Sequence, residues 1–240
     1  MTVGRIDVHS HLLPGLDDGC KTVEESILCA RMLVHAGYTH SFCTPHIWPD
    51  LPSNTVHNIK EQTKNLQAAL DAAGVALRLF PGAELNLRAD TPTRAVEDVP
   101  TMAMGRKFIL IDLWANRLPP FFKTSIQWLQ SLGLKVILAH PERMAVIQSN
   151  PNLADEIAQM GVLLQGNLQC FSDPPDAPTR RVAEQFLAEG RYFLLGTDLQ
   201  QLASLPPRLA GLQRAIELAG TDVVDRMTIH HPRQLLEDLG

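Results

Sequence analysis

The sequence predicts an α/β fold with parallel strands, and a barrel is the architecture that suits its length. Short β-type runs recur along the 240 residues, each followed by a helical pattern. Polar side chains that can bind metal follow the ends of these runs. α/β barrels of this length often form one unit, and no stretch has the composition of a linker. We therefore expect a single domain over residues 1–240.

Seven runs have the length and composition of strands. They are Arg5–His9, Thr39–Thr44, Ala76–Pro81, Lys107–Leu113, Leu134–Ala139, Val162–Gln165 and Tyr192–Leu195. Because helical patterns separate them, the strands are expected to run parallel to one another.

The helices between the strands carry start and stop signals. Thr22 and Glu25 form a capping box in front of an apolar stripe that ends at Gly37. A second stripe runs from Val56 to Gly74. Both stripes are typical of helices that cover a core, so we assign them no binding role.

Composition narrows the class of protein. A hydrophobic content of 45% is that of a globular chain, and a net charge of -5 with a pI near 6.0 gives no broad basic surface for nucleic acid. There is no signal peptide and no long apolar run, so membrane insertion is not expected. The four cysteines form no C-x-x-C pair, which favours a reducing cytoplasm.

The most informative stretch follows the first predicted strand. His9 and His11 are two residues apart, and residues i and i+2 of a strand point to the same face, so both imidazoles can reach one metal ion. Asp17 and Asp18 follow in a short Pro/Gly loop and offer oxygen ligands. A solvated turn after an edge strand is the alternative for the H-x-H pattern alone.

Further polar residues follow the other predicted strands. They are His46, Glu84, Asp112, His140, Asn167 and Asp198. In a parallel barrel these positions all lie on the C-terminal rim, where such folds assemble their sites. Each has another explanation by itself, such as a turn, a helix N-cap or a solvated loop end, but together they predict a metal cluster.

This mixture of residues suits phosphate ester hydrolysis. Carboxylates can bridge two divalent ions, imidazoles fix the geometry of each ion, and a water between ions has a pKa of roughly 7. Arg143 lies three residues after His140, and its guanidinium can bind two phosphate oxygens. An ion pair with Glu142 or another acid at the rim is the alternative for Arg143.

Five motifs stand in order along the chain: D-V-H-S-H-L-L-P-G-L-D-D-G-x-K-T-x-E-E-S, T-P-H, G-A-E-L, A-H-P-E-R and T-D. With them the chain resembles the PHP (polymerase and histidinol phosphatase) superfamily. Within it, the chain is most similar to the bacterial manganese-dependent protein-tyrosine phosphatases of capsule and exopolysaccharide synthesis. The resemblance spans nearly the whole chain, and the first twenty-six residues are its most specific part.

The resemblance implies a distorted, TIM-like (βα)7 barrel of the PHP type, with two to three divalent ions on its C-terminal rim. The ions would be manganese, with iron or zinc as alternatives. The implied ligands are His9, His11, Glu84 and Asp198 for the first ion, Glu84, Asp112 and His140 for the second, and Asp18, His46 and the position of Gln200 for the third. Arg143 would bind the phosphate and act in catalysis together with His46 and Asp198.

The chain departs from the family pattern at three places. Gln200 stands where a histidine of the third site is expected, which predicts a weaker third ion. Asp112 replaces a glutamate and is one methylene shorter. The loop 201–207 lacks an expected phosphate-binding arginine, and Arg208 could substitute for it only if the loop is rearranged.

Three functions remain open at this point. The leading one is hydrolysis of phosphotyrosine on a tyrosine autokinase that controls polysaccharide export. The alternatives are hydrolysis of a small phosphate, such as histidinol phosphate or a nucleotide, and a metal-poor binding protein without turnover. A cysteine-dependent tyrosine phosphatase is excluded, because no cysteine is followed six positions later by arginine. The sequence does not give the oligomeric state.

Overall fold

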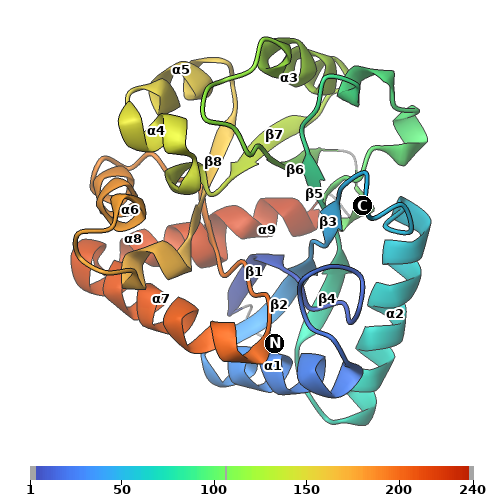
Figure 1. The fold of residues 1–240 in the computed structure, drawn as a ribbon. Helices are drawn as coiled ribbons and strands as arrows, with labels where there is room; N and C mark the ends of the chain where they lie inside the picture. Colours follow the sequence, from blue (N-terminus) through green and yellow to red (C-terminus); the bar gives the residue numbers. More distant parts are fainter. Residues whose placement is uncertain (1–3, 106, 238–240) are drawn as a thin grey trace.

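A computed structural model describes residues 4–105 and 107–237 and has parallel strands at its centre with helices around them (Figure 1). The strands are β1 (Arg5–Ser10), β2 (Tyr38–Cys43), β3 (His46–Ile47), β4 (Arg78–Pro81), β5 (Glu84–Asn86), β6 (Phe108–Asp112), β7 (Lys135–Ala139), β8 (Leu163–Asn167) and β9 (Leu194–Gly196). All seven predicted strands are present. The structure adds two short strands that were not predicted, β3 and β5, which follow the predicted runs ending at Thr44 and Pro81.

The strands form two parallel sheets, in the orders β1-β2-β4 and β3-β5-β6-β7-β8-β9. Thr44-Pro45 separates β2 from β3, and Gly82-Ala83 separates β4 from β5. Pro45 has no backbone N–H to donate to a neighbouring strand. Backbone hydrogen bonds join the ends of the series: Asp198 N donates to His9 O over 2.8 Å, and His11 N donates to Leu199 O over 2.7 Å. The ring of strands is therefore a distorted barrel, as the sequence predicted.

The helices lie between successive strands or follow the last one. They are α1 (Val23–His35), α2 (Val56–Ala72), α3 (Phe121–Ser131), α4 (Ala145–Ser149), α5 (Leu153–Gln159), α6 (Pro178–Ala188), α7 (Leu205–Ala219), α8 (Thr221–Asp225) and α9 (His231–Leu236). The Thr22 side chain caps α1 by accepting from Glu25 N, whereas the Glu25 carboxylate accepts from Lys21 N.

The connection from β5 to β6 differs from the expected pattern of a helix after every strand. Its described residues, 87–105 and 107, contain three short 3₁₀ turns, Thr91–Thr93, Val96–Asp98 and Met102–Met104, and no α-helix. Pro92 and Pro100 interrupt this stretch, and a proline inside an α-helix removes a hydrogen bond and clashes with the preceding turn.

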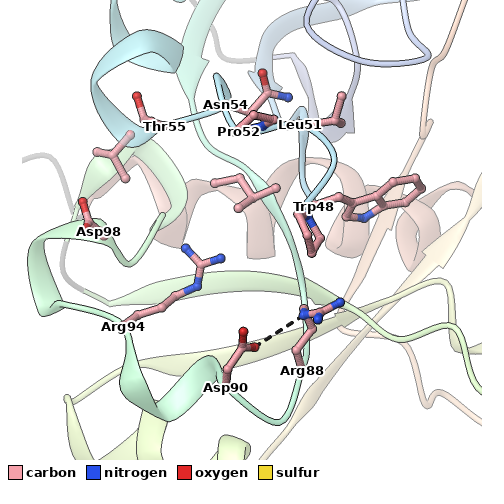
Figure 2. A pocket seen from close by; sticks show the side chains of 12 residues that line it. Trp48, Leu51, Pro52, Asn54, Thr55, Arg88, Asp90, Arg94 and Asp98 are labelled. Atoms are coloured by element: carbon pink, nitrogen blue, oxygen red, sulfur yellow. Dashed lines mark ion pairs between the residues drawn. The ribbon is translucent and has the colours of Figure 1, made fainter.

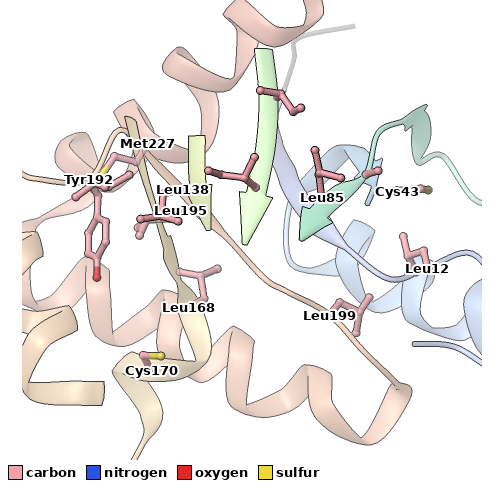
Figure 3. Close-up of a cluster of buried hydrophobic side chains, with 14 of the residues drawn as sticks. Leu12, Cys43, Leu85, Leu138, Leu168, Cys170, Tyr192, Leu195, Leu199 and Met227 are labelled. Carbon is pink, nitrogen blue, oxygen red and sulfur yellow. The ribbon is translucent and has the colours of Figure 1, made fainter. Parts of the chain in front are cut away.

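Buried apolar side chains fill the space between strands and helices. Figure 3 shows part of the larger cluster, with Leu85, Leu138 and Leu195 contributed by β5, β7 and β9. A second cluster joins Ile6 and Phe108 to Leu235 of α9, which passes behind the strands in Figure 1. No helix within the described ranges is long and apolar enough to cross a bilayer.

Candidate metal centre

The C-terminal ends of the strands bring together the polar residues that the sequence singled out. His9, His11, Glu84 and Asp112 are fully buried, and His46, His140 and Asp198 are at most 5% exposed. They lie at the ends of β1, β3, β5, β6 and β7, or directly after them, and in the turn after β9. Burying this many ionisable groups is costly unless they are paired or hold metal.

The first implied ligand set is assembled around two imidazoles. The Nε2 atoms of His9 and His11 lie 3.3 Å apart. His9 Nε2 is 3.3 Å from Glu84 Oε2 and 3.5 Å from Asp198 Oδ1, and His11 Nε2 is 3.6 Å and 3.3 Å from the same two atoms. Four donor atoms from three strand ends therefore face one point.

Glu84 connects this set to a second one. Its Oε1 lies 2.8 Å from His140 Nε2, and its Oε2 lies 2.8 Å from His46 Nδ1. Ligand atoms of His46, Glu84 and Asp112 all lie within 4.8 Å of one another. His46 thus approaches the second set as well as the third, which the resemblance alone did not imply.

The third set is more open to solvent. Asp18 has a side chain that is 64% exposed, and its Oδ1 lies 3.6 Å from His46 Nε2. The residue that completes a group with Asp18 and His46 is His11. Gln200 lines a pocket with Asp18, its Nε2 donates to Asp198 Oδ1 over 3.0 Å, and its Oε1 is buried without a hydrogen-bond partner.

Two residues of the site have left-handed backbone geometry. His140 has a φ of 34° and Asp198 has a φ of 50°, directly after β7 and close after β9. Such conformations are unfavourable for residues other than glycine and cluster at functional sites. Here they accompany side chains that turn toward Glu84 and toward the two histidines after β1.

Three buried side chains outside the ligand sets that the resemblance implied hold those ligands in place. Asp17 Oδ2 accepts from His11 Nδ1 over 2.6 Å and from the backbone N of His46 over 2.9 Å. Gln165 Oε1 lies 2.8 Å from His9 Nδ1, and Asn167 Nδ2 donates to Asp198 Oδ2 over 2.7 Å. Partners of this kind fix which ring nitrogen is left to face a metal. The acid pair Asp17-Asp18 was the signal in the sequence for Asp17, whereas the resemblance implied the exposed Asp18 as the ligand.

Electrostatics show how strongly the carboxylates act on their neighbours. Burial opposes the ionisation of Glu84, but the His9 charge and the His140 hydrogen bond hold its pKa well below the usual value. Burial lowers the pKa of His11, yet Asp17 and Asp198 raise it well above the usual value. Burial and the negative charge of Glu84 raise the pKa of Asp112 to about 6.

These shifts and the donor set fit divalent metal ions. The buried carboxylates lower their energy by keeping nearby imidazoles protonated, and a cation bound among them would supply that positive charge instead. Glu84 Oε2 and His46 Nδ1 are buried and lack well-oriented hydrogen bonds. Imidazole and carboxylate together suit manganese, iron or zinc.

Two arginines line a pocket of about 170 Å³ beside the cluster. Arg143 Nη1 donates to Asp198 Oδ2 over 2.8 Å, and its guanidinium lies 5.1 Å from the ring centroid of Trp114. Arg208 is 4% exposed and donates through Nε to Asp198 O over 2.8 Å. It reaches this pocket because α7 begins at Leu205, three residues earlier.

Comparison with known sequences identifies relatives over most of the chain. Residues 5–237 match the family model described as capsular polysaccharide synthesis, CpsB/CapC. The tyrosine-protein phosphatase YwqE of Bacillus subtilis is 28% identical over 160 residues, which cover 67% of this chain and 63% of YwqE. The putative tyrosine-protein phosphatase CapC of Staphylococcus aureus is 27% identical, with 84% of this chain and 79% of CapC covered.

Solved structures share the fold. A structure from the study of B. subtilis YwqE and Streptococcus pneumoniae CpsB, described as metal-dependent tyrosine phosphatases, superposes with a TM-score of 0.87 at 22% identity and covers 98% of this chain and 95% of that one. The phosphotriesterase homology protein of Escherichia coli superposes with a TM-score of 0.57 at 12% identity, covering 98% of this chain and 99% of its own. With its family model matched from residue 5 to residue 237, the chain belongs to the CpsB/CapC family of capsular polysaccharide synthesis.

Proposed function

We propose that this protein is a metal-dependent phosphatase that hydrolyses phosphotyrosine in proteins. The observation that carries the proposal is the buried cluster of four histidines and three carboxylates at the strand ends, with Arg143 beside it. Relatives in the same family are named tyrosine-protein phosphatases, which supports phosphotyrosine over other phosphate esters. The family's role in capsular polysaccharide synthesis supports a tyrosine autokinase of polysaccharide export as the substrate protein.

We assign the metal ligands as the resemblance implied them. His9, His11, Glu84 and Asp198 hold one ion, Glu84, Asp112 and His140 a second, and Asp18 and His46 a third, weaker one near Gln200. Bound ions supply positive charge that polarises the phosphoryl group and makes a water molecule acidic near neutral pH. Manganese is the proposed metal, and the donor set also admits iron and zinc.

Arg143 and Trp114 form the side of the site that meets the substrate. Arg143 uses Nη1 to hold Asp198, which leaves further guanidinium donors for phosphate oxygens. Trp114 is 53% exposed and donates from Nε1 to Asp112 Oδ2 over 2.6 Å, so its ring is fixed beside Arg143. An exposed aromatic face next to a phosphate-binding arginine suits a phosphorylated phenol.

Hydrolysis of phosphotyrosine does not need a strong general acid in the site, because its leaving group is a phenolate. A phenolate leaves readily, so charge stabilisation by Arg143 and the metal cluster can carry much of the reaction. The imidazole ring of His46 stacks on the indole ring of Trp48, and their centroids are 4.0 Å apart. Its Nε2 lies 3.6 Å from Oδ1 of the exposed Asp18, at the position proposed for the third, weaker ion.

A substrate panel tests this function. Purified protein is assayed with phosphotyrosyl peptides, phosphoseryl peptides and small phosphate monoesters, including histidinol phosphate and a nucleotide, before and after removal of metal. We expect manganese-dependent hydrolysis with the highest kcat/KM on phosphotyrosyl peptides. A preference of tenfold or more for histidinol phosphate or a nucleotide would replace the proposed substrate class.

A further inference from the structure

A second pocket, of about 370 Å³, lies beside the metal centre between the chain that follows β3 and the chain that follows β5 (Figure 2). Its walls come from residues 47–56 and 88–98. β3 and β5 are adjacent parallel strands, with His46 opposite Glu84 and Ile47 opposite Leu85. One wall of the pocket therefore begins one residue after His46, and the other begins four residues after Glu84.

Trp48 forms the boundary between the metal centre and this pocket. Its indole ring stacks on His46 with an interplanar angle of 23°, and the same residue lines the pocket. Arg88 follows Glu84 by four residues, which is at most about 13 Å of extended chain. A substrate peptide whose phosphate lies at the metal centre would reach the pocket over roughly three to four residues.

Arg94 is a cation of the pocket without an ion-pair partner in the described ranges, although Asp90 and Asp98 line the same pocket. Its side chain is half-buried and makes no hydrogen bond or ion pair with any residue in the described ranges, and in Figure 2 its guanidinium extends into the pocket. Arg88, in contrast, has Asp90 as an ion-pair partner, with Nε and Oδ1 3.4 Å apart. A half-buried guanidinium without an ion-pair partner favours an anionic group that offers two oxygens.

The remaining lining indicates a polypeptide. Pro49, Leu51, Pro52 and Val56 form an apolar side of the pocket. Asp90 and Asp98 also line it and would repel a ligand with several negative charges, such as a nucleotide. A single carboxylate carried on an aliphatic chain satisfies both the apolar side and Arg94.

We propose that this pocket is a substrate subsite that binds an aspartate or glutamate side chain of the substrate protein, three to four residues from the phosphotyrosine, with its carboxylate on Arg94. The inference rests on the proposed function, because it takes a phosphotyrosine protein as the substrate. It gives the enzyme a preference for acidic sequences around the phosphotyrosine.

The test compares two phosphotyrosyl peptides. One has Glu at the positions three and four residues before and after the phosphotyrosine, and the other has Gln at the same positions; the rest of the sequence is the same. Wild type, Arg94→Gln and Arg226→Gln are assayed on both peptides and on p-nitrophenyl phosphate. Arg226 is the matched control, an exposed arginine next to the Arg5–Asp225 ion pair at the opposite end of the barrel.

Wild type and Arg226→Gln are expected to have a kcat/KM about three- to tenfold higher for the Glu peptide, through a lower KM. Arg94→Gln is expected to lose this preference while its rates on the Gln peptide and on p-nitrophenyl phosphate stay at the wild-type level. An unchanged preference in Arg94→Gln, or no preference in wild type, overturns the subsite and leaves the phosphatase function standing. A wild type that hydrolyses p-nitrophenyl phosphate but neither peptide overturns the proposed substrate class as well.

Discussion

Replacing Glu84 with glutamine tests the core of the proposed metal centre. Glu84 is fully buried, contacts His140 and His46 at 2.8 Å and His9 at 3.3 Å, and belongs to two of the three candidate metal groups. Glutamine keeps the volume of the side chain but removes the negative charge that two ions would share. We therefore expect Glu84→Gln to lose about two ions per chain while the protein stays folded.

The expected effect on rate follows from the same contacts. A metal ion stabilises the transition state by several kcal/mol. Loss of the ions should therefore remove at least about 4 kcal/mol of this stabilisation and lower kcat/KM by roughly a thousandfold. The matched control is Asp18→Asn, because Asp18 is 64% exposed and belongs to a single group. That variant should lose at most one ion and keep more activity than Glu84→Gln.

Elemental analysis after gel filtration in metal-free buffer measures the ions, and circular dichroism with a thermal melt measures folding. A folded Glu84→Gln protein with the parental metal content and rate would refute the shared-carboxylate arrangement. Equal metal loss in Asp18→Asn and Glu84→Gln would refute the assignment of Glu84 to two groups.

Three further predictions concern the rim of the site and the helix that supports it. Arg143→Ala should remove about 2–4 kcal/mol of transition-state stabilisation and so lower kcat/KM, while the metal content stays unchanged; kinetics and elemental analysis check the two together. Parental activity would make Arg143 only an ion-pair partner of Asp198. Metal titration of wild type should show two tightly bound ions and a weakly bound third, because the amide oxygen of Gln200 is a poorer ligand than imidazole. Gln200→His should bind the third ion more tightly. Three ions retained after long dialysis would contradict this prediction. Gly211→Ala should lower the free energy of unfolding by about 3 kcal/mol, because a Cβ at this position would lie 1.7 Å from Leu168 O. Urea titration measures this change, and an unchanged midpoint would show that α7 can move without loss of stability.

Local signals in the sequence predicted the strands and the cap of α1 because they depend on neighbouring residues. Thr22 caps the helix through Glu25 N, as a capping residue does in any chain. The connection from β5 to β6 was less predictable. A helical pattern was expected after every strand, but Pro92 and Pro100 favour 3₁₀ turns and extended chain here.

The candidate ligands could be found because each follows the end of a strand, and a parallel barrel places those ends together. Their grouping was not available from the sequence. His46 approaches both Glu84 and Asp18, and His11 completes the group with Asp18, because the division of β2 from β3 at Pro45 sets where His46 lies.

The sequence by itself determined the positions of seven strands along the chain, the residue types at each strand end and the family resemblance, since these are properties of local pattern and spacing. Only the tertiary structure decided the order of the strands in the sheets, which buried partners orient the ligands, such as Asp17 on His11 and Gln165 on His9, and which arginine is left without an ion-pair partner. These contacts join residues from separate strands and loops. Their distances depend on how the barrel closes, and no local spacing in the chain records that.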